Sequence, residues 1–261
     1  MQIEAATLTR QGARDHNEDR FGHWAGGSHA VWLVADGAGG HGGGDVAAQV
    51  VCDTIVAGFA AQPTLDPAQL RELVLRANAS VITRQHEGGR LADMRSTVVM
   101  VAFDLVAGRM VWAHSGDSRA YLFRQQAIVA RTTDHSLVQQ MVASGMIDDE
   151  TARQHPQRSI LLSALGTDVD ELEITVSGPM RLAPGDEVML CSDGIWEVLG
   201  DQRLIACVAG SGSARQWAAE VEQAVLAADK HEQDNFTGLF LRIQSDDVHE
   251  SAIVATGQPG T

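Results

Sequence analysis

Short apolar runs bounded by turn residues recur along this 261-residue chain and predict strands. The run Ala-Val-Trp-Leu-Val-Ala at 30–35 is apolar at every position, as expected for a central strand that is covered on both faces. Comparable runs predict strands at 3–9, 97–103, 110–115, 120–124, 127–131, 171–176, 187–191 and 237–243. Turn residues such as Ala107-Gly108 separate neighbouring runs, a pattern typical of antiparallel strands.

Other segments show helical periodicity, at 45–59, 68–85, 195–208 and 214–228. The order of strands, helices, strands and helices predicts an α+β fold, a four-layer αββα sandwich in which two antiparallel β-sheets pack together between flanking helix pairs. We expect one domain over 1–245, interrupted by a more polar segment at 132–167. The last residues, 246–261, lose the apolar periodicity and are expected to form a frayed tail.

Three apolar runs finish at an aspartate beside a glycine: Asp36-Gly37, Gly116-Asp117 and Asp193-Gly194. Taken singly, an Asp-Gly pair is more often a turn than a ligand. An ionised carboxylate at the end of a buried segment is costly unless an opposite charge accompanies it, so several such acids together predict hard divalent cations, Mg²⁺ or Mn²⁺. The neighbouring glycines let the backbone turn toward a ligand, and a tight turn there would use a positive φ.

Two further acidic clusters lie near opposite ends of the chain, at 14–20 and 233–237. Their acids can join the three aspartates only if the first and last strands are neighbours. The sequence therefore predicts that these two strands lie side by side.

The formal net charge of −15 restricts the possible partners. A polyanion would be repelled, so we expect no nucleic-acid or membrane partner and favour a cation binder. Cys52, Cys191 and Cys207 have no CxxC spacing, so neither a disulfide framework nor a zinc site is predicted. No segment approaches the length of a membrane span and the N-terminus has no leader-like pattern, so we expect a cytoplasmic protein. We also expect it to be a monomer.

Seven motifs occur in a fixed order: Arg14…Asn17-Glu18-Asp19, Asp36-Gly37-Ala38-Gly39-Gly40-His41, Gly116-Asp117-Ser118-Arg119, Asp134-His135-Ser136, Ala164-Leu165-Gly166, Ser192-Asp193-Gly194 and Asp234-Asn235-Phe236-Thr237. Through these seven motifs and their order, the chain resembles the metal-dependent PPM/PP2C serine/threonine protein phosphatases, particularly their compact bacterial members. The likeness covers roughly residues 5–243, nearly the whole chain. It implies hydrolysis of phosphoserine and phosphothreonine in proteins, opposing a Ser/Thr kinase.

The resemblance also implies which residues hold two Mn²⁺ or Mg²⁺ ions. Asp36 would bridge both ions. Asp193 and Asp234 would complete the protein ligands of the first ion, and Glu18 with the carbonyl of Gly37 would hold the second. Water shared by two dications is acidic enough to be a hydroxide at neutral pH, and the same ions neutralise the phosphoryl oxygens during in-line attack.

Further roles follow from the same resemblance. Asp19 would orient the attacking water from outside the ligand set, and Asp117 with Asp193 would form a weaker third metal position. Arg14 would bind the substrate phosphate. His41 is either the proton donor to the leaving alcohol or a loop histidine that caps the following helix, and the residues leave both open. Ala38 stands where many eukaryotic relatives carry a histidine.

The segment 132–167 resembles the flap of the family, which lies beside the site and influences substrate choice. Ser159 and Ser163 stand where bacterial relatives commonly carry asparagine and arginine, so the role of this flap stays open.

Three other functions were compared with the phosphatase. A Ser-His-Asp hydrolase would need a G-x-S-x-G elbow, which the sequence lacks. A metal-dependent nuclease conflicts with the negative charge. The main alternative is a catalytically weak binding or scaffold module of the same fold, which would be expected to lose metal-binding acids. This chain retains the five acids of the family pattern, and we therefore predict an active enzyme. These acids are Glu18, Asp36, Asp117, Asp193 and Asp234.

Overall fold

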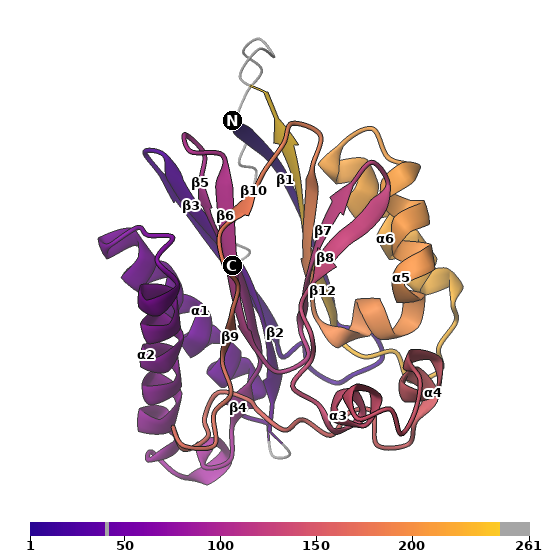
Figure 1. The fold of residues 1–261 in the computed structure, drawn as a ribbon. Helices are drawn as coiled ribbons and strands as arrows, with labels where there is room; N and C mark the ends of the chain where they lie inside the picture. The colour runs from indigo at the N-terminus through magenta and orange to yellow at the C-terminus, as the bar shows by residue number, and fades with distance from the viewer. Residues whose placement is uncertain (40–41, 246–261) are drawn as a thin grey trace.

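The structure is a computed structural model that describes residues 1–39 and 42–245 (Figure 1). His41 and the predicted tail at 246–261 lie outside the described residues. Within them the chain forms two antiparallel sheets that pack face to face, with helices on both outer sides. The predicted four-layer α+β architecture is confirmed.

The first sheet has the strand order β1-β12-β11-β7-β8, in residues Gln2–Arg10, Phe236–Gln244, Glu187–Cys191, Arg119–Arg124 and Ala127–Arg131. Strands β1 and β12 pair along their whole length, from Gln2 opposite Gln244 to Arg10 opposite Phe236. This pairing brings the first and last strands side by side, as predicted, and it places the segments at 11–18 and 229–235 at the same end of the sandwich.

The second sheet has the order β10-β6-β5-β3-β2, in residues Met180–Arg181, Arg109–Ser115, Val98–Asp104, His29–Ala38 and Asp19–Gly26. Two short strands join it at the side: β4 (Arg95–Ser96) pairs with β3, and β9 (Thr175–Val176) pairs with β6. The strand predicted at 171–176 is therefore wrong apart from its last two residues, which form β9.

Helices α1 (Gly44–Ala61) and α2 (Pro67–Gln85) cover the second sheet, and α5 (Asp193–Ala209) and α6 (Ala214–Ala227) cover the first (Figure 1). A 3-10 turn, η1 (Gly89–Leu91), precedes β4. The flap contributes α3 (Leu137–Ala143) and α4 (Asp149–Gln154). Helix α5 begins two residues earlier than predicted, at Asp193 itself.

Strand β3 explains why its sequence is apolar at every position. Successive side chains of a strand point to opposite faces. Val31 and Leu33 pack against α1 and α2, whereas Trp32 and Val34 pack between the two sheets. All four side chains are buried, so neither face of β3 tolerates a polar residue until the strand reaches Asp36 near its end.

Helix α1, with 18 residues, has the length and apolar composition of a membrane span. The expectation that no segment approaches a span is therefore wrong on that criterion. Ile55 and Phe59 of this helix are fully buried in one cluster with Leu33 and Leu70. The apolar face of α1 is thus used inside the fold, between the second sheet and α2.

Candidate active site

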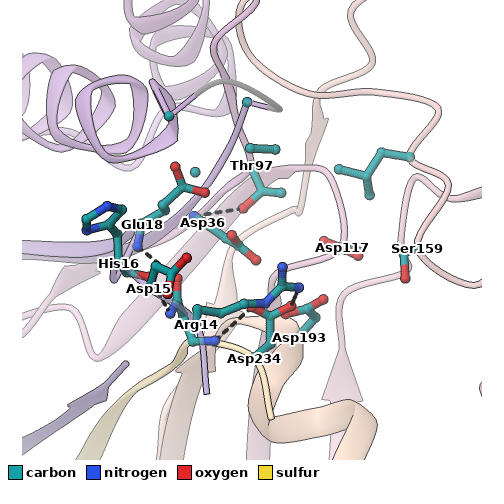
Figure 2. Close-up of a pocket in the computed structure, with 16 residues that line it drawn as sticks. Arg14, Asp15, His16, Glu18, Asp36, Thr97, Asp117, Ser159, Asp193 and Asp234 are labelled. Atoms are coloured by element: carbon teal, nitrogen blue, oxygen red, sulfur yellow. Dashed lines mark hydrogen bonds and ion pairs between the residues drawn. The ribbon is translucent and has the colours of Figure 1, made fainter. Parts of the chain in front are cut away.

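A cavity of about 500 Å³ opens at the end of the sandwich where the chain enters β2 and leaves β3 (Figure 2). Besides Asp15 in the loop before β2, its acidic lining comes from five separate places in the fold: the residue before β2, the end of β3, the turn after β6, the first turn of α5 and the segment before β12. The acids at these places are Glu18, Asp36, Asp117, Asp193 and Asp234. All five acids predicted as metal ligands, and Gly37 with them, therefore line one cavity.

The glycines beside the acids are needed for close backbone contact. A Cβ on Gly37 would lie 2.1 Å from the carbonyl oxygen of Gly44, where α1 begins, and a Cβ on Gly194 would lie 2.1 Å from that of Asn235. Of the three glycines in the Asp-Gly and Gly-Asp pairs, Gly116 has a positive φ, at 102°. The tight-turn explanation thus holds for Gly116 but is wrong for Gly37 and Gly194, which lie inside β3 and α5.

Crowded negative charge dominates the electrostatics of the cavity. Burial raises the pKa of Asp36 well above its usual value, and the neighbouring Asp19 and Asp193 raise it further. Burial likewise raises the pKa of Asp193, with Asp117 adding to the effect. The pKa of Asp117 rises to about 7 through burial and the nearby Asp134. Without added positive charge, these carboxylates resist being ionised together.

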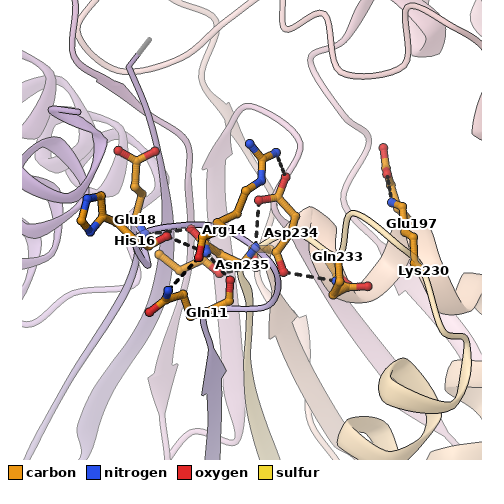
Figure 3. Close-up of polar contacts among 12 residues, drawn as sticks. Gln11, Arg14, His16, Glu18, Glu197, Lys230, Gln233, Asp234 and Asn235 are labelled. Atoms are coloured by element: carbon orange, nitrogen blue, oxygen red, sulfur yellow. Dashed lines mark hydrogen bonds and ion pairs between the residues drawn. The ribbon is translucent and has the colours of Figure 1, made fainter. Parts of the chain in front are cut away.

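Arg14 provides one positive charge within this cluster (Figures 2 and 3). Its Nη2 atom donates to Oδ2 of Asp234 at 2.5 Å, and this hydrogen bond raises the pKa of the arginine. In the described part of the chain, no three acidic, histidine or cysteine side chains are grouped tightly enough to enclose an ion unaided. The donor set of carboxylates and a backbone carbonyl is nonetheless the one that Mg²⁺ and Mn²⁺ prefer, and its mutual repulsion fits added cations.

Asp19 lies outside the cavity wall, opposite Asp36 in the pairing of β2 with β3. It is 3% exposed, and the hydroxyl of Ser192 donates to its Oδ2 atom at 2.7 Å. Burial raises its pKa to about 6. Oδ1 of Asp19 is buried without a protein partner within the described residues.

Sequence reasoning missed the residues that hold the acids in place. The side chain of Asn235 accepts from the backbone N–H of Glu18 at 2.8 Å and donates to the carbonyls of Gln11 and His16 at 2.7 and 2.9 Å (Figure 3). It thereby joins the loop before β2 to the loop before β12. Its position beside Asp234 was a signal of this role, but which loop it contacts depends on the pairing of β1 with β12.

Thr97 plays a comparable role on the other sheet. Its hydroxyl accepts from the backbone N–H of Asp36 at 3.1 Å and lies 2.7 Å from the hydroxyl of Ser118. No sequence pattern marks this threonine, because it reaches Asp36 from the junction of β4 and β5 only through the register of the second sheet.

The flap contacts the site through its C-terminal half. Ser159 and Leu161 line the cavity. Ser163 is buried, and its hydroxyl lies 3.0 Å from that of Ser115 and accepts from the backbone N–H of Glu173 at 2.8 Å. Of the two unusual serines, Ser159 faces the site and Ser163 anchors the flap to β6.

The family model for protein phosphatase 2C matches residues 9–234, which includes every acid of the cavity. The chain belongs to the protein phosphatase 2C family. It is a protein serine/threonine phosphatase of the PPM type.

Curated relatives agree with this assignment. The serine/threonine phosphatase stp of Listeria monocytogenes is 31% identical over 197 residues, covering 73% of this chain and 77% of the relative. The serine/threonine protein phosphatase PstP of Mycobacterium tuberculosis is 35% identical over 203 residues, covering 77% of this chain but 38% of PstP.

A solved structure of the PstP catalytic domain in complex with two manganese ions superposes with a TM-score of 0.80. It is 27% identical in sequence, and the match covers 93% of this chain and 99% of that domain. The likeness therefore extends over the whole sandwich and includes a structure that holds two metal ions.

The crowded acids predict how stability depends on pH in the absence of metal. Asp117 and Asp19 have pKa values near 7 and 6 in the fold, above the ordinary aspartate value of about 3.9 in an unfolded chain. The folded protein therefore binds more protons than the unfolded chain, and its stability rises as the pH falls from 8 to 6.5. Melting temperatures in EDTA should increase over this range.

Saturating Mn²⁺ should reduce this dependence, because bound cations favour ionised carboxylates, and Asp117→Asn should weaken it in EDTA. Burial lowers the pKa of His114 to about 4 and also lowers the pKa of His135, so these two histidines oppose the trend near pH 6.5. The carboxylates outweigh them, because burial raises the pKa of Asp36 and Asp193 as well as that of Asp117 and Asp19. A melting temperature in EDTA that stays constant or falls between pH 8 and 6.5 would contradict the prediction.

Proposed function

We propose that this chain removes phosphate from phosphoserine and phosphothreonine in proteins by using two bound Mn²⁺ or Mg²⁺ ions, and that it opposes a Ser/Thr kinase in the cytoplasm. One observation carries the proposal: the five predicted ligand acids come from five separate places in the fold and line a single cavity, and burial and mutual repulsion raise the pKa of most of them. Such an arrangement is unfavourable by itself and becomes favourable when cations bind.

The residues would divide the ions between them as the family pattern implies. Asp36 would contact both ions, Asp193 and Asp234 the first, and Glu18 with the carbonyl of Gly37 the second. When bound, such ions supply a water that is deprotonated at neutral pH and neutralise the charge of the phosphoryl oxygens. Asp117 together with Asp193 would provide a third, weaker position.

Arg14 would bind the phosphate of the substrate. A guanidinium group can donate two parallel hydrogen bonds to a phosphate. In the structure its side chain is 60% exposed and pairs with Asp234 across the cavity mouth. With a cation beside Asp234 the pair would weaken, which would leave the guanidinium for the incoming phosphate.

Asp19 would act through its neighbours. Its position opposite Asp36 and its hydrogen bond with Ser192 tie β2 to the segment that leads into α5. We propose that it fixes the orientation of water near Asp36. His41 remains a candidate proton donor, and it lies outside the described residues.

The proposed function is tested by phosphate release from a phosphothreonine peptide after treatment with EDTA, before and after Mn²⁺ or Mg²⁺ is restored. We expect no release in EDTA and full recovery with metal. The same protein with Ca²⁺ serves as a control for charge neutralisation without catalysis. Folded protein that binds Mn²⁺ but releases no phosphate would overturn the proposal and favour the scaffold alternative.

The setting of the protein is part of the same proposal. Cys52, Cys191 and Cys207 are all free thiols and all buried, which supports a reducing compartment. We further propose that the protein acts as a monomer and that its substrates include the kinase it opposes and the targets of that kinase.

A further inference from the structure

We propose that a second cavity, between the flap and α5, binds an anionic group of the substrate protein a few residues from the phosphorylated residue. The group is a phosphate or a carboxylate. The inference rests on the proposed function, because it concerns the substrate of the same site. The cavity measures about 250 Å³, and we call it the arginine cavity. Among the described residues four arginines line it: Arg119, Arg131, Arg153 and Arg158.

The arginine cavity differs in charge from its surroundings. Besides the four arginines, its described lining contains three acids: Asp134, Glu197 and Asp201. By contrast, the 500 Å³ cavity that contains Asp36 and Asp193, which we call the catalytic cavity, has six acids and one arginine in its described lining. The whole chain carries a formal charge of −15. An anionic segment of a substrate would be repelled by most of this surface and attracted at the arginine cavity.

Arg158 retains donors for a ligand. It contacts Glu197 through Nε, at 3.2 Å, and within the part of the chain that the structure describes its two terminal nitrogens have no partner. Glu197 is already shared, because Nζ of Lys230 lies 3.3 Å from it (Figure 3). One carboxylate thus faces two cations, which leaves excess positive charge beside Arg158.

Arg153 enters the cavity from α4. It contacts Glu150 on its own helix through Nη2, and its Nη1 lies close to the backbone of Gly200, at the kink of α5. Two arginines from the flap side therefore approach α5 with planar groups that suit phosphate or carboxylate oxygens.

The arginine cavity is next to the catalytic cavity. Arg158 lines the first and the following residue, Ser159, lines the second. Figure 2 shows Ser159 and Asp117 among the side chains that line the catalytic cavity. On α5, Asp193 lines the catalytic cavity and Glu197, one helical turn later, lines the arginine cavity.

This spacing fits one extended peptide. A helical turn spans about 5.4 Å, and an extended chain advances about 3.3 Å per residue. A peptide whose phosphorylated residue enters the catalytic cavity would place a residue two to four positions away at the arginine cavity. Substrates with an acidic or second phosphorylated residue at that distance should therefore be preferred.

The test compares phosphothreonine peptides that carry alanine, glutamate or a non-hydrolysable phosphoserine analogue at two to four positions on either side. We expect kcat/KM of the wild-type protein to be about fivefold or more higher for at least one anionic peptide than for the alanine peptide, mainly through KM. The glutamate and phosphoserine-analogue arms tell which anion the cavity takes. Arg158→Ala should bring the ratio close to one. The matched control Arg215→Ala, at an exposed position of α6, should leave the ratio unchanged.

Charge reversal separates recognition from a structural role. In Arg158→Glu the preference should turn toward a peptide with lysine at the same position, which general damage to the flap would not produce. A wild-type ratio of about one, or a preference that survives in Arg158→Ala, would overturn the inference. We would also compare the binding affinities of labelled anionic and alanine peptides in EDTA, where the proposed hydrolysis does not occur. This measurement tells whether the arginine cavity fails to bind anions or whether the proposed phosphatase activity is absent.

Discussion

Replacing Asp193 with asparagine is expected to lower kcat/KM for a phosphothreonine peptide about a thousandfold in the presence of Mn²⁺. Asp193 opens α5 and lines the catalytic cavity, where we propose that it holds a metal ion. Asparagine keeps the shape but loses the charge that binds the ion. Metal-ion catalysis contributes several kcal/mol to such reactions, and each 1.36 kcal/mol corresponds to about tenfold in rate.

The same substitution should raise the melting temperature in EDTA, because it removes one charge from a crowded cluster in which burial and Asp117 already raise the pKa of Asp193. Stabilisation by Mn²⁺ should shrink correspondingly. Steady-state kinetics and thermal melts with and without metal measure the two effects. Asp53→Asn, at an exposed position of α1 that lines neither cavity, serves as the matched control for activity. Near-normal activity of Asp193→Asn would contradict the assignment.

Removing Arg119 is expected to cost about 3–5 kcal/mol of unfolding free energy, the typical result of breaking a buried ion pair. Arg119 is 7% exposed, and its Nε and Nη2 atoms donate to the two carboxylate oxygens of Asp134 at 2.8 and 2.7 Å. Its guanidinium carbon lies 3.4 Å from the ring centre of Trp196. Arg119→Ala leaves the Asp134 carboxylate buried without its partner.

A double-mutant cycle measures this effect. The unfolding free energies of Arg119→Ala, Asp134→Ala and the double variant are obtained by urea unfolding. The double variant should be less destabilised than the sum of the single ones, because neither charge is then left unpaired. Arg203→Ala, at an exposed position of α5, should change the unfolding free energy by less than about 0.5 kcal/mol. A cost below about 1 kcal/mol for Arg119→Ala would contradict the prediction that breaking this buried ion pair is strongly destabilising.

Local patterns were sufficient for most elements and for the acids. The apolar run at 30–35 predicted a strand that is covered on both faces. The structure agrees, because each face of this strand packs in a different hydrophobic core. The strand prediction at 171–176 failed for its first four residues, because only Thr175 and Val176 pair with a neighbouring strand, β6. A strand needs a neighbour, and the neighbour is a property of the fold.

The acids were recognisable because the chemistry requires particular residue types at the ends of buried segments. The supporting contacts were not recognisable, because only the fold brings the partners together. Asn235 contacts Glu18, and Thr97 contacts Asp36, from distant parts of the chain. Arg119 meets Asp134 only because the β7–β8 hairpin returns the chain to it. The arginine cavity has the same origin, since its arginines come from β7, β8, α4 and the segment after α4.

The sequence by itself determined the layer order, the identity of the carboxylates and the family to which they belong. These depend on hydrophobic periodicity and on which side chains can bind a hard cation, and both are local properties. The tertiary structure decided which distant residues hold those carboxylates, how strongly their charges repel, and where a second, positively charged cavity lies. Distances across the sandwich set these properties, through the pairing of β1 with β12 and the packing of the flap on α5.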